Sequence, residues 1–435
     1  MQAHKPPPGI GALPVEKPHA SDAAAAARAA FCACRFSKRP PCAKMLAGGY
    51  CRRNKLGRCC AVDNKLYEKA VALRHALHAA PELSGREAGT KRMLQQFLHE
   101  NAPSLNVTDR GAWFYAVYRC GRPGARRIAF RADIDALPIQ EKNSLPYASR
   151  CPGVAHKCGH DGHAAALEAL ACRICAGGAP CDVYFIFQHA EETGEGGAVC
   201  AALLEEEAIE EVYAFHNMPG LAKGTVFLRE GTMHCASTGM TLHFTGAPTH
   251  ASTPELGRNP AAAVSELVCA LPGFTQPARH RGIVLATVIQ IDVGARAFGV
   301  SASEGSLLLT IRAQLQSELD ALRSAVAELA SRLAKRDGLA LEVSYCEAFP
   351  ETANAPGPVQ RVFKACRAAG VPAEALQEPM RCSEDFGWYL QKRPGAIFYV
   401  GDGEAHAPLH DAMFDFPDEA LRTAADVFFA IAQGF

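Results

Sequence analysis

The sequence lacks several features that would place it in a specialised class of protein. Its 435 residues contain no run of 18 apolar residues, so we expect no transmembrane helix and no membrane partner. The segment from Met1 to Pro8 lacks the charged region and apolar run of a secretory signal, which predicts a cytoplasmic location. The formal net charge at pH 7 is +0, which argues against a general nucleic-acid binder.

Apolar periodicity is also missing from the first 60 residues, where positive charge is concentrated instead. This segment carries 11 Lys and Arg against Glu16 and Asp22, a net charge of +9, and the remainder carries −9. Its six cysteines, at positions 32, 34, 42, 51, 59 and 60, include no Cys-x-x-Cys pair. We predict that residues 1–62 form a disordered, basic, cysteine-rich tail, with a small zinc or iron–sulfur module as the alternative.

From Asn64 onward the chain alternates between helix and strand patterns. Apolar residues recur at helical spacing from Leu66 to Leu77, and 183–187 is a continuous apolar run typical of a buried parallel strand. Further helices are expected over 86–99, 164–175 and 197–206, and further strands over 113–119, 127–131 and 212–215. This alternation predicts an α/β fold, a mixed sheet with helices on both faces.

The pattern changes near residue 236 and returns near residue 347. Between these points we expect strands over 241–244, 283–293, 306–312 and 339–345, with helices over 260–271 and 317–335. A helix over 358–369, a strand over 396–400 and a helix over 418–432 then resume the α/β pattern. We predict one catalytic domain made of residues 63–235 and 347–435, interrupted by a smaller α+β lid domain over residues 236–346.

The most informative motif places Cys158, His160 and His163 within six residues. Glycines at 159 and 162 permit a sharp turn of the backbone that would aim these side chains inward. A thiolate with imidazoles suits zinc and its first-row neighbours. The 18 cysteines of the chain, without a secretory signal, indicate reduced thiols, so this motif predicts a metal site rather than a disulfide.

Carboxylates and further histidines follow the expected strands. Glu191 and Glu192 come shortly after the strand 183–187, where both can face one site only in a turn, which the glycines at 194, 196 and 197 permit. Functional groups gather beyond the carboxyl ends of strands in such sheets, and His216 ends the strand 212–215. Asp133 and Asp135 also follow a strand and are placed to orient ligand histidines.

At this point the chain resembles a known family from about Tyr67 to Ile431. It is similar to the dinuclear metal-dependent amidohydrolases, which include aminoacylases, hippurate hydrolases, indole-acetyl-amino-acid hydrolases and zinc peptidases of the carboxypeptidase G type. The resemblance is carried by motifs in the family's order, at residues 73–83, 131–138, 158–163, 188–192, 249–252, 383–386 and 409–410. It implies a zinc-peptidase-like mixed sheet with an inserted lid, and hydrolysis of the amide bond of N-acyl amino acids or related small amides.

The resemblance also implies roles for particular residues. The implied ligands of two divalent metal ions are Cys158, His160, Glu192, His216 and His410. Glu191 would act as general base and then general acid, and His250 of the lid would polarise the scissile carbonyl. Asp135 would support a metal ligand, and Arg312 would meet the substrate's carboxylate. The metal remains open among manganese, zinc, nickel and cobalt, and the acyl group and amino acid remain open as well.

Three positions depart from the family pattern. Lys157 stands where a small or apolar residue is usual, His189 where proline is frequent, and Gly299 where the lid usually carries asparagine. The loss of that asparagine motivates one alternative, a non-catalytic homologue that binds metal or ligand. A hydrolase with Cys158 as nucleophile is another alternative. For assembly, we expect a monomer or a homodimer formed through the lid domain.

Overall fold

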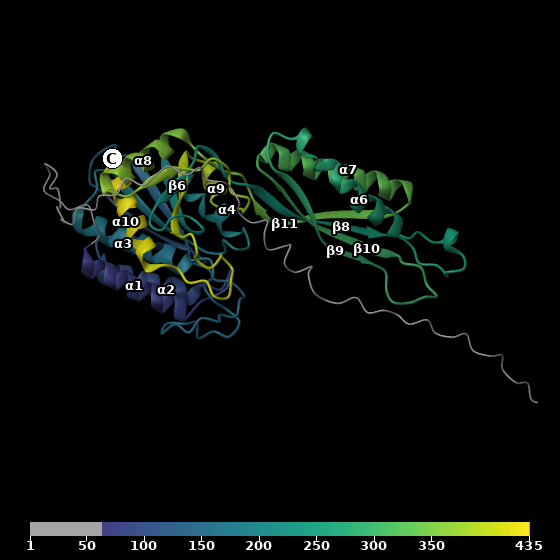
Figure 1. Cartoon of the computed structure of the whole chain (residues 1–435), viewed down its shortest axis with the longest axis horizontal. Helices are drawn as coiled ribbons and strands as arrows, with labels where there is room; N and C mark the ends of the chain where they lie inside the picture. Colours follow the sequence, from purple (N-terminus) through teal and green to yellow (C-terminus); the bar gives the residue numbers. More distant parts are fainter. Residues whose placement is uncertain (1–62, 435) are drawn as a thin grey trace, which may run out of the picture. The chain divides into compact units, whose positions relative to one another are not determined.

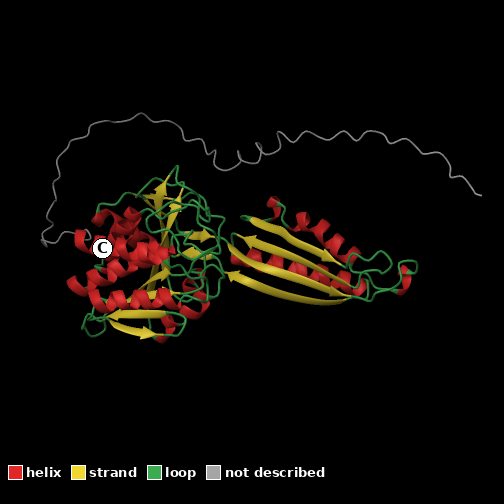
Figure 2. Cartoon of the chain, turned by 90° about the horizontal axis from the view of Figure 1, so that it is seen from below, coloured by secondary structure: helices red, strands yellow, loops and turns green. Residues whose placement is uncertain are grey.

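The computed structural model describes residues 63–434, and the prediction of a disordered or metal-binding tail over 1–62 lies outside these residues. In this range no helix is long and apolar enough to cross a membrane. The strands form a large sheet and a separate four-stranded sheet, with a further pair of short strands (Figure 2).

The large sheet has eight strands and is mixed, as the α/β pattern predicts. Its spatial order is β1 (Asn106–Asp109), β2 (Phe114–Tyr118), β4 (Asp182–Gln188), β3 (Arg127–Asp133), β5 (Glu211–Pro219), β14 (Gly395–Gly403), β6 (Val226–Leu228) and β13 (Ala373–Ala375). The central strands β4, β3, β5 and β14 run parallel, whereas β1 and β2 pair antiparallel with their neighbours. Strand β6 is antiparallel to β14 and parallel to β13. The parallel strands therefore bring their carboxyl ends to one edge.

Helices cover both faces of this sheet, because alternate residues of each buried strand point to opposite sides. Phe185 of β4 belongs to one apolar core and Tyr184 to the other. The first core is covered by α1 (Asn64–Ala79), α2 (Ala88–Asn101), α3 (His160–Gly177), α8 (Pro356–Ala369) and α10 (Asp418–Ala432) (Figure 1). The second is covered by α4 (Gly196–Cys200), α5 (Leu203–Glu206) and α9 (Gly387–Leu390).

The four-stranded sheet lies in the segment that the sequence predicts as an insertion. Its order is β11 (Ala340–Phe349), β8 (Ala236–Thr245), β10 (Glu304–Ala313) and β9 (Val284–Val293), all antiparallel. Two helices, α6 (Ala261–Phe274) and α7 (Gln316–Arg336), lie on one face of it (Figure 1) and close a third apolar core around Leu242 and Leu309. We call these six elements the inserted layer; its action as a separate lid domain stays a prediction.

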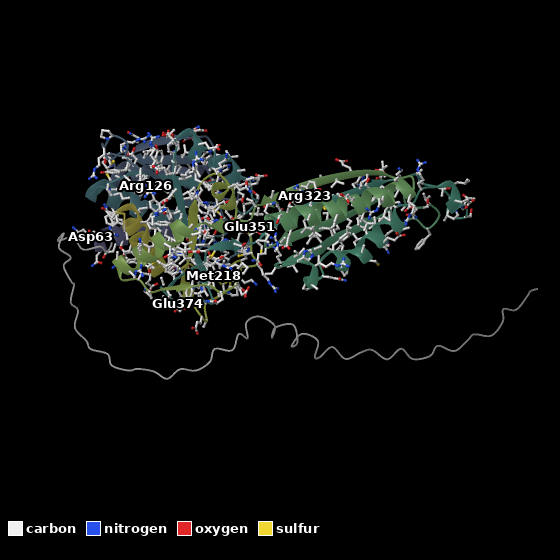
Figure 3. All side chains as sticks on the ribbon, turned by 90° about the horizontal axis from the view of Figure 1, so that it is seen from above. Asp63, Arg126, Met218, Arg323, Glu351 and Glu374 are labelled. Carbon is white, nitrogen blue, oxygen red and sulfur yellow. The ribbon has the colours of Figure 1, made fainter. Side chains whose placement is uncertain are left out.

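The other face of the inserted layer carries no helix among the described residues, and its side chains alternate accordingly. Leu307, Leu309 and Ile311 of β10 point into the apolar core, whereas Thr310 and Arg312 point the other way. Arg323 of α7, labelled in Figure 3, packs over the ring of Tyr345.

Short connecting elements complete the chain. They are the strand pair β7 (Gly231–His234) and β12 (Thr352–Asn354), and the 3-10 helices η1 (Pro254–Leu256) and η2 (Pro277–Arg279). Glu351, labelled in Figure 3, accepts hydrogen bonds from the Gln316 backbone N–H, at 2.9 Å, and from the Thr232 hydroxyl, at 2.5 Å. This carboxylate thereby ties the inserted layer to the strand that precedes it.

The structure corrects two of the predicted helices. The helix expected over 164–175 begins at His160, so the metal-binding motif forms its first turn. The helix expected over 197–206 is two short helices, α4 and α5. The strands β1, β6, β7, β12 and β13 were not predicted, because three or four residues are too few to show a period.

Candidate metal centre and cavity

The predicted ligands meet at the carboxyl edge of the parallel strands. Asp133 ends β3, the Glu191–Glu192 turn follows β4, and His216 lies near the end of β5. Figure 3 labels Met218, two residues beyond His216 on the same strand. This is the edge where α/β sheets collect functional groups, because the strand ends converge there.

The turn that starts α3 depends on Gly159. Its φ of 107° is left-handed, and a Cβ there would lie 2.1 Å from Asn217 Oδ1. Gly162 has a different role from the predicted one. It lies inside α3, and a Cβ there would lie 2.5 Å from the Phe416 ring. Gly159 therefore makes the turn, and Gly162 allows the helix to pack closely.

Asp135 orients two parts of the site, as expected for a residue that supports a ligand. His160 Nδ1 donates to the Asp135 carbonyl oxygen at 3.0 Å and to its Oδ1 at 3.1 Å, which leaves Nε2 facing the other donors. Asp135 Oδ2 accepts from the Glu192 backbone N–H at 3.0 Å and from Ser84 Oγ at 2.6 Å. One carboxylate thus sets the imidazole orientation and the carboxylate turn together.

The Glu191–Glu192 turn is made by Ala190 rather than by glycine alone. Ala190 adopts a φ of 48°, which is uncommon for a residue with a side chain. Its backbone carbonyl accepts from Gly196 N–H at 3.0 Å, and a Cβ at Gly196 would lie 1.7 Å from the His189 carbonyl oxygen. The predicted glycine therefore permits a close approach, and the strained residue lies beside the two carboxylates, where strain commonly accompanies function.

The two remaining predicted ligands also present a ring nitrogen to the site. His216 Nδ1 donates to the Asn217 carbonyl oxygen at 2.6 Å, and its Nε2 lies 3.4 Å from Cys158 Sγ. Burial lowers the pKa of His216, so its imidazole is neutral, the form that binds metals. His410, with a φ of 64°, places its Nε2 at 3.7 Å from Glu192 Oε1.

The five side chains form two donor groups that share one residue. Ligand atoms of Cys158, His160 and His216 lie within 4.8 Å of one another, and so do those of Cys158, Glu192 and His410. His160 Nε2 and Glu192 Oε1 are buried without a hydrogen-bond partner among residues 63–434. Buried polar atoms are rarely left unpaired, so a cation at each group fits these residues. Sulfur, nitrogen and oxygen donors suit first-row metals.

Glu191 has a supporting network that the sequence reasoning missed. Its Oε1 lies 3.5 Å from the Asp385 backbone N–H, and the side chain is 8% exposed. Burial raises the pKa of Glu191, and the Glu384 and Asp385 carboxylates raise it further. The buried Arg131 guanidinium pairs with Glu384 at 3.1 Å and with Asp385 at 2.6 Å. The motifs at 131–138 and 383–386 carried these residues, but spacing could not show that they meet.

The sequence assigned no role to His163 or His189, and the two side chains have different surroundings. His163 Nδ1 donates to Asp133 Oδ1 at 2.6 Å, and its Nε2 lies 2.8 Å from Asn217 Oδ1. Both ring nitrogens are therefore occupied, and His163 acts as a buried support beside His216. His189 lies against Cys200, with its Nδ1 at 3.9 Å from that sulfur.

Lys157, the first departure from the family pattern, has a structural explanation. Its side chain is 0% exposed, and its Nζ donates to Glu141 Oε1 at 2.6 Å and to the Phe414 carbonyl at 2.7 Å. Its own carbonyl accepts from the His410 backbone N–H at 2.7 Å. Lys157 therefore joins the loop of Cys158 to the loop of His410.

A cavity of about 300 Å³ adjoins the donor groups. Its lining includes Arg312 and, from the rest of the chain, Cys158, Glu191, Glu192, His216, Met218, His234, Ser237, Thr238, Gly239, Thr310, Glu347, Phe349, Cys382, Ser383, Glu384, Tyr399, Leu409 and His410. Arg312 Nη1 donates to the Arg381 carbonyl at 2.7 Å and to Ser383 Oγ. Arg312 therefore lies in the same cavity as the donor groups, and its binding of a substrate carboxylate stays a prediction.

The structure does not bring His250 to this cavity. His250 is exposed, its Nδ1 lies 2.7 Å from Ser252 Oγ, and it forms an isolated bridge with Val300. Gly299 accepts from the Ala251 backbone N–H in the same exposed loop. The predicted carbonyl-polarising residue and the departure at Gly299 are thus neighbours, and both lie outside the cavity lining.

A mixed α/β sheet with two adjoining metal-donor groups, a buried carboxylate and a cavity defines a metal-dependent hydrolase. The model of peptidase family M20/M25/M40 matches residues 129–434, and the chain belongs to this family.

Individual relatives align with most of this chain, and one of known structure shares its fold. The chain is 29% identical over 363 residues to N-acetyldiaminopimelate deacetylase of Exiguobacterium sibiricum, with 81% of this chain and 96% of the relative covered. The crystal structure of Bacillus subtilis YxeP, a dinuclear metal binding peptidase from the M20 family, superposes with a TM-score of 0.72 at 25% identity. That match covers 85% of this chain and 98% of YxeP.

Proposed function

We propose that this protein hydrolyses the amide bond of N-acyl amino acids, with two bound divalent metal ions. The observation that carries the proposal is the pair of donor groups sharing Cys158, in a cavity whose lining includes Arg312. The Glu191 carboxylate lies within 4.8 Å of His160 in one group and of Glu192 in the other. The N-acetyldiaminopimelate deacetylases among its relatives support an acylated amino acid as substrate.

In this proposal Glu191 moves the protons. Its Oε2 lies 3.9 Å from His160 Nε2, so it borders a donor group without belonging to the five ligands. A raised pKa suits a group that must take a proton from the attacking water and return it to the departing amine. The return step is needed because an amine anion is a poor leaving group.

The donor groups would hold the cations, and other residues would hold the substrate. When bound, such cations lower the pKa of water and polarise a carbonyl oxygen. Arg312 would bind the substrate carboxylate, since a guanidinium matches a carboxylate in geometry. His250 would donate to the developing oxyanion once a movement of the inserted layer, or the layer of a second copy, brings it to the cavity.

The nucleophilic-cysteine alternative fits the surroundings of Cys158 less well. A reactive cysteine needs positive neighbours that stabilise its thiolate. Cys158 is buried, and burial, together with Glu192 and Glu191, raises the pKa of its thiol. The non-catalytic alternative rests on Gly299, which is absent from the cavity lining and shares an exposed loop with His250. The deacylation assay below decides between it and the hydrolase.

Two assemblies remain predictions, a monomer and a homodimer through the inserted layer. Strand β9 lies at the edge of its sheet and exposes Ile289 at 60% and Ile291 at 52%. An exposed apolar edge strand is a natural surface for pairing with a second copy. Sedimentation of the purified chain distinguishes the two states.

Deacylation of a panel of N-acyl amino acids by the protein loaded with manganese, zinc, nickel or cobalt tests the function. We expect Glu191→Gln to lower kcat about 10²- to 10⁴-fold, because it removes the general base, while metal content stays unchanged. Glu195→Gln, in the same turn but exposed, is the matched control and should keep full activity. Equal rates for Glu191→Gln and the parent would refute the mechanism. Activity that survives a chelator would favour the cysteine nucleophile.

A further inference from the structure

Two opposite charges in the cavity lining have no ionic partner. Within residues 63–434, Arg312 lies within ion-pair distance of no carboxylate, and the Glu347 carboxylate makes no ion pair or hydrogen bond. The other acidic residues of the lining have partners or roles of their own. Glu384 forms an ion pair with Arg131, and Glu191 and Glu192 belong to the metal centre. Arg312 is also the single Arg or Lys among the described lining residues.

The two charges lie on separate strands of the inserted layer. Arg312 is on β10 and Glu347 is on β11, with β8 between them. Neighbouring strands lie about 4.8 Å apart, so their backbones are about 10 Å apart here. On β8, Ser237 and Gly239 line the cavity between them, and a Cβ at Gly239 would lie 2.6 Å from Cys346 Sγ. Cys346 thus packs beside Gly239, and the cavity extends over β8 between the two charged residues.

A backbone irregularity places Glu347 at the cavity. On β11, Glu347 and Ala348 oppose the single β8 residue Thr238, which is the arrangement of a β-bulge. Glu347 adopts a φ of 50°, a left-handed conformation that costs free energy for a residue with a side chain. The other described residues of this kind with side chains include Ala190 and His410 of the metal centre. Bulges beside active sites commonly re-aim a side chain, which fits the position of Glu347 in the lining.

We propose that this cavity selects N-acyl amino acids whose side chain carries a positive charge, with Arg312 binding the α-carboxylate and Glu347 binding the side-chain cation. The inference rests on the proposed function and names its substrate class. An amino acid with an ammonium three or four carbons beyond Cα, such as ornithine or lysine, carries a carboxylate and a cation at opposite ends, the charges that Arg312 and Glu347 complement. A neutral side chain of the same length would leave Glu347 without a partner, and an acidic one would be repelled.

Matched substrates test this selectivity. We would compare kcat/KM for Nα-acetyl-L-lysine, Nα-acetyl-L-norleucine and Nα-acetyl-L-glutamate with the full chain loaded with metal. We expect a preference for lysine over norleucine of about 1.5- to fivefold, the range for an exposed charge pair. Added salt should reduce the preference, because an exposed charge is screened.

Variants assign the preference to one carboxylate. Glu347→Gln should bring the lysine-to-norleucine ratio close to one, and Glu347→Arg should favour glutamate over lysine. Glu342→Gln removes an exposed carboxylate from the same strand outside the cavity lining, so it should leave the ratio unchanged. An equal loss on all three substrates in Glu347→Gln, or the absence of any preference in the parent, would overturn the inference.

Binding of the free amino acids separates this inference from the proposed function. If no N-acyl amino acid is hydrolysed, the proposed function fails. Calorimetric binding of L-lysine and L-norleucine to the parent and to Glu347→Gln then decides the inference. Tighter binding of lysine that disappears in the variant supports it, and equal binding of both amino acids refutes it.

Discussion

Replacing Lys157 by methionine removes a buried charge while keeping most of the side chain's volume. The lost contacts are the hydrogen bonds to Glu141 at 2.6 Å and to the Phe414 carbonyl at 2.7 Å. Glu141 keeps bonds to His78 and to the Ser149 backbone N–H, and the Phe414 carbonyl keeps one from Asn143. No acceptor is therefore left unpaired by the change.

The expected cost follows from those contacts. A hydrogen bond to a charged group contributes about 1.5–3 kcal/mol, and relief from burying the ammonium offsets part of the loss. We expect Lys157→Met to lower the free energy of unfolding by about 2–4 kcal/mol. Glu141→Gln alone leaves the ammonium without a carboxylate, so it should cost about 3–5 kcal/mol. The double variant should lose at least 1 kcal/mol less than the sum of the single losses, as coupled partners do.

Denaturant unfolding of the metal-free protein measures these differences, and competition with a chromogenic chelator measures metal affinity. Because Lys157 joins the loops of Cys158 and His410, its loss should also weaken metal binding. Lys392→Met breaks a partly exposed pair with Glu205 and serves as the control, with an expected cost below about 1 kcal/mol. The reasoning is refuted if Lys157→Met unfolds like the parent, or if the double-variant losses simply add.

Two further predictions concern buried carboxyl groups. Asp135→Asn should weaken metal affinity about 10- to 100-fold, because it disturbs the orientation of His160; unchanged affinity by chelator competition would contradict this role. Glu168 is buried in α3 with no hydrogen-bond partner in the described part of the chain, and burial raises its pKa. The folded state then keeps a proton that the unfolded state releases above its ordinary pKa of 4.5, so this group's contribution to stability falls as pH rises from there. The free energy of unfolding should be measured at pH 5 and at pH 8. Between them, the value for Glu168→Gln should rise relative to the parent by up to about 1.4 kcal/mol per pH unit. The value for exposed Glu328→Gln should not change relative to the parent.

Most helices and central strands could be predicted because their patterns are local. The run at 183–187 and the helical spacing from Leu66 to Leu77 lie within β4 and α1. Short strands such as β6 and β13 were not predicted, because their pairing is decided by distant residues. The first turn of α3 was not predicted either, because glycines at 159 and 162 suggest an irregular loop.

In the candidate site, too, the features that follow from residue type were predicted, and the contacts between distant segments were not. The five predicted ligands and Asp135 carry a chemical signal in their residue types, and the parallel strands bring their ends together. The support of Glu191 by Asp385 joins residues 194 positions apart, and no local pattern contains that contact. His250 has a motif but an exposed position, which no motif could reveal.

By itself, the sequence determined which side chains could bind metal and which segments alternate as strand and helix, because residue chemistry and periodicity are properties of neighbouring positions. Only the tertiary structure decided that Lys157 joins two ligand loops, that Ala190 makes the carboxylate turn, and that a bulge places Glu347 across from Arg312. These features arise from contacts between segments far apart in the chain, where packing selects backbone conformations and charge partners that local preference does not specify.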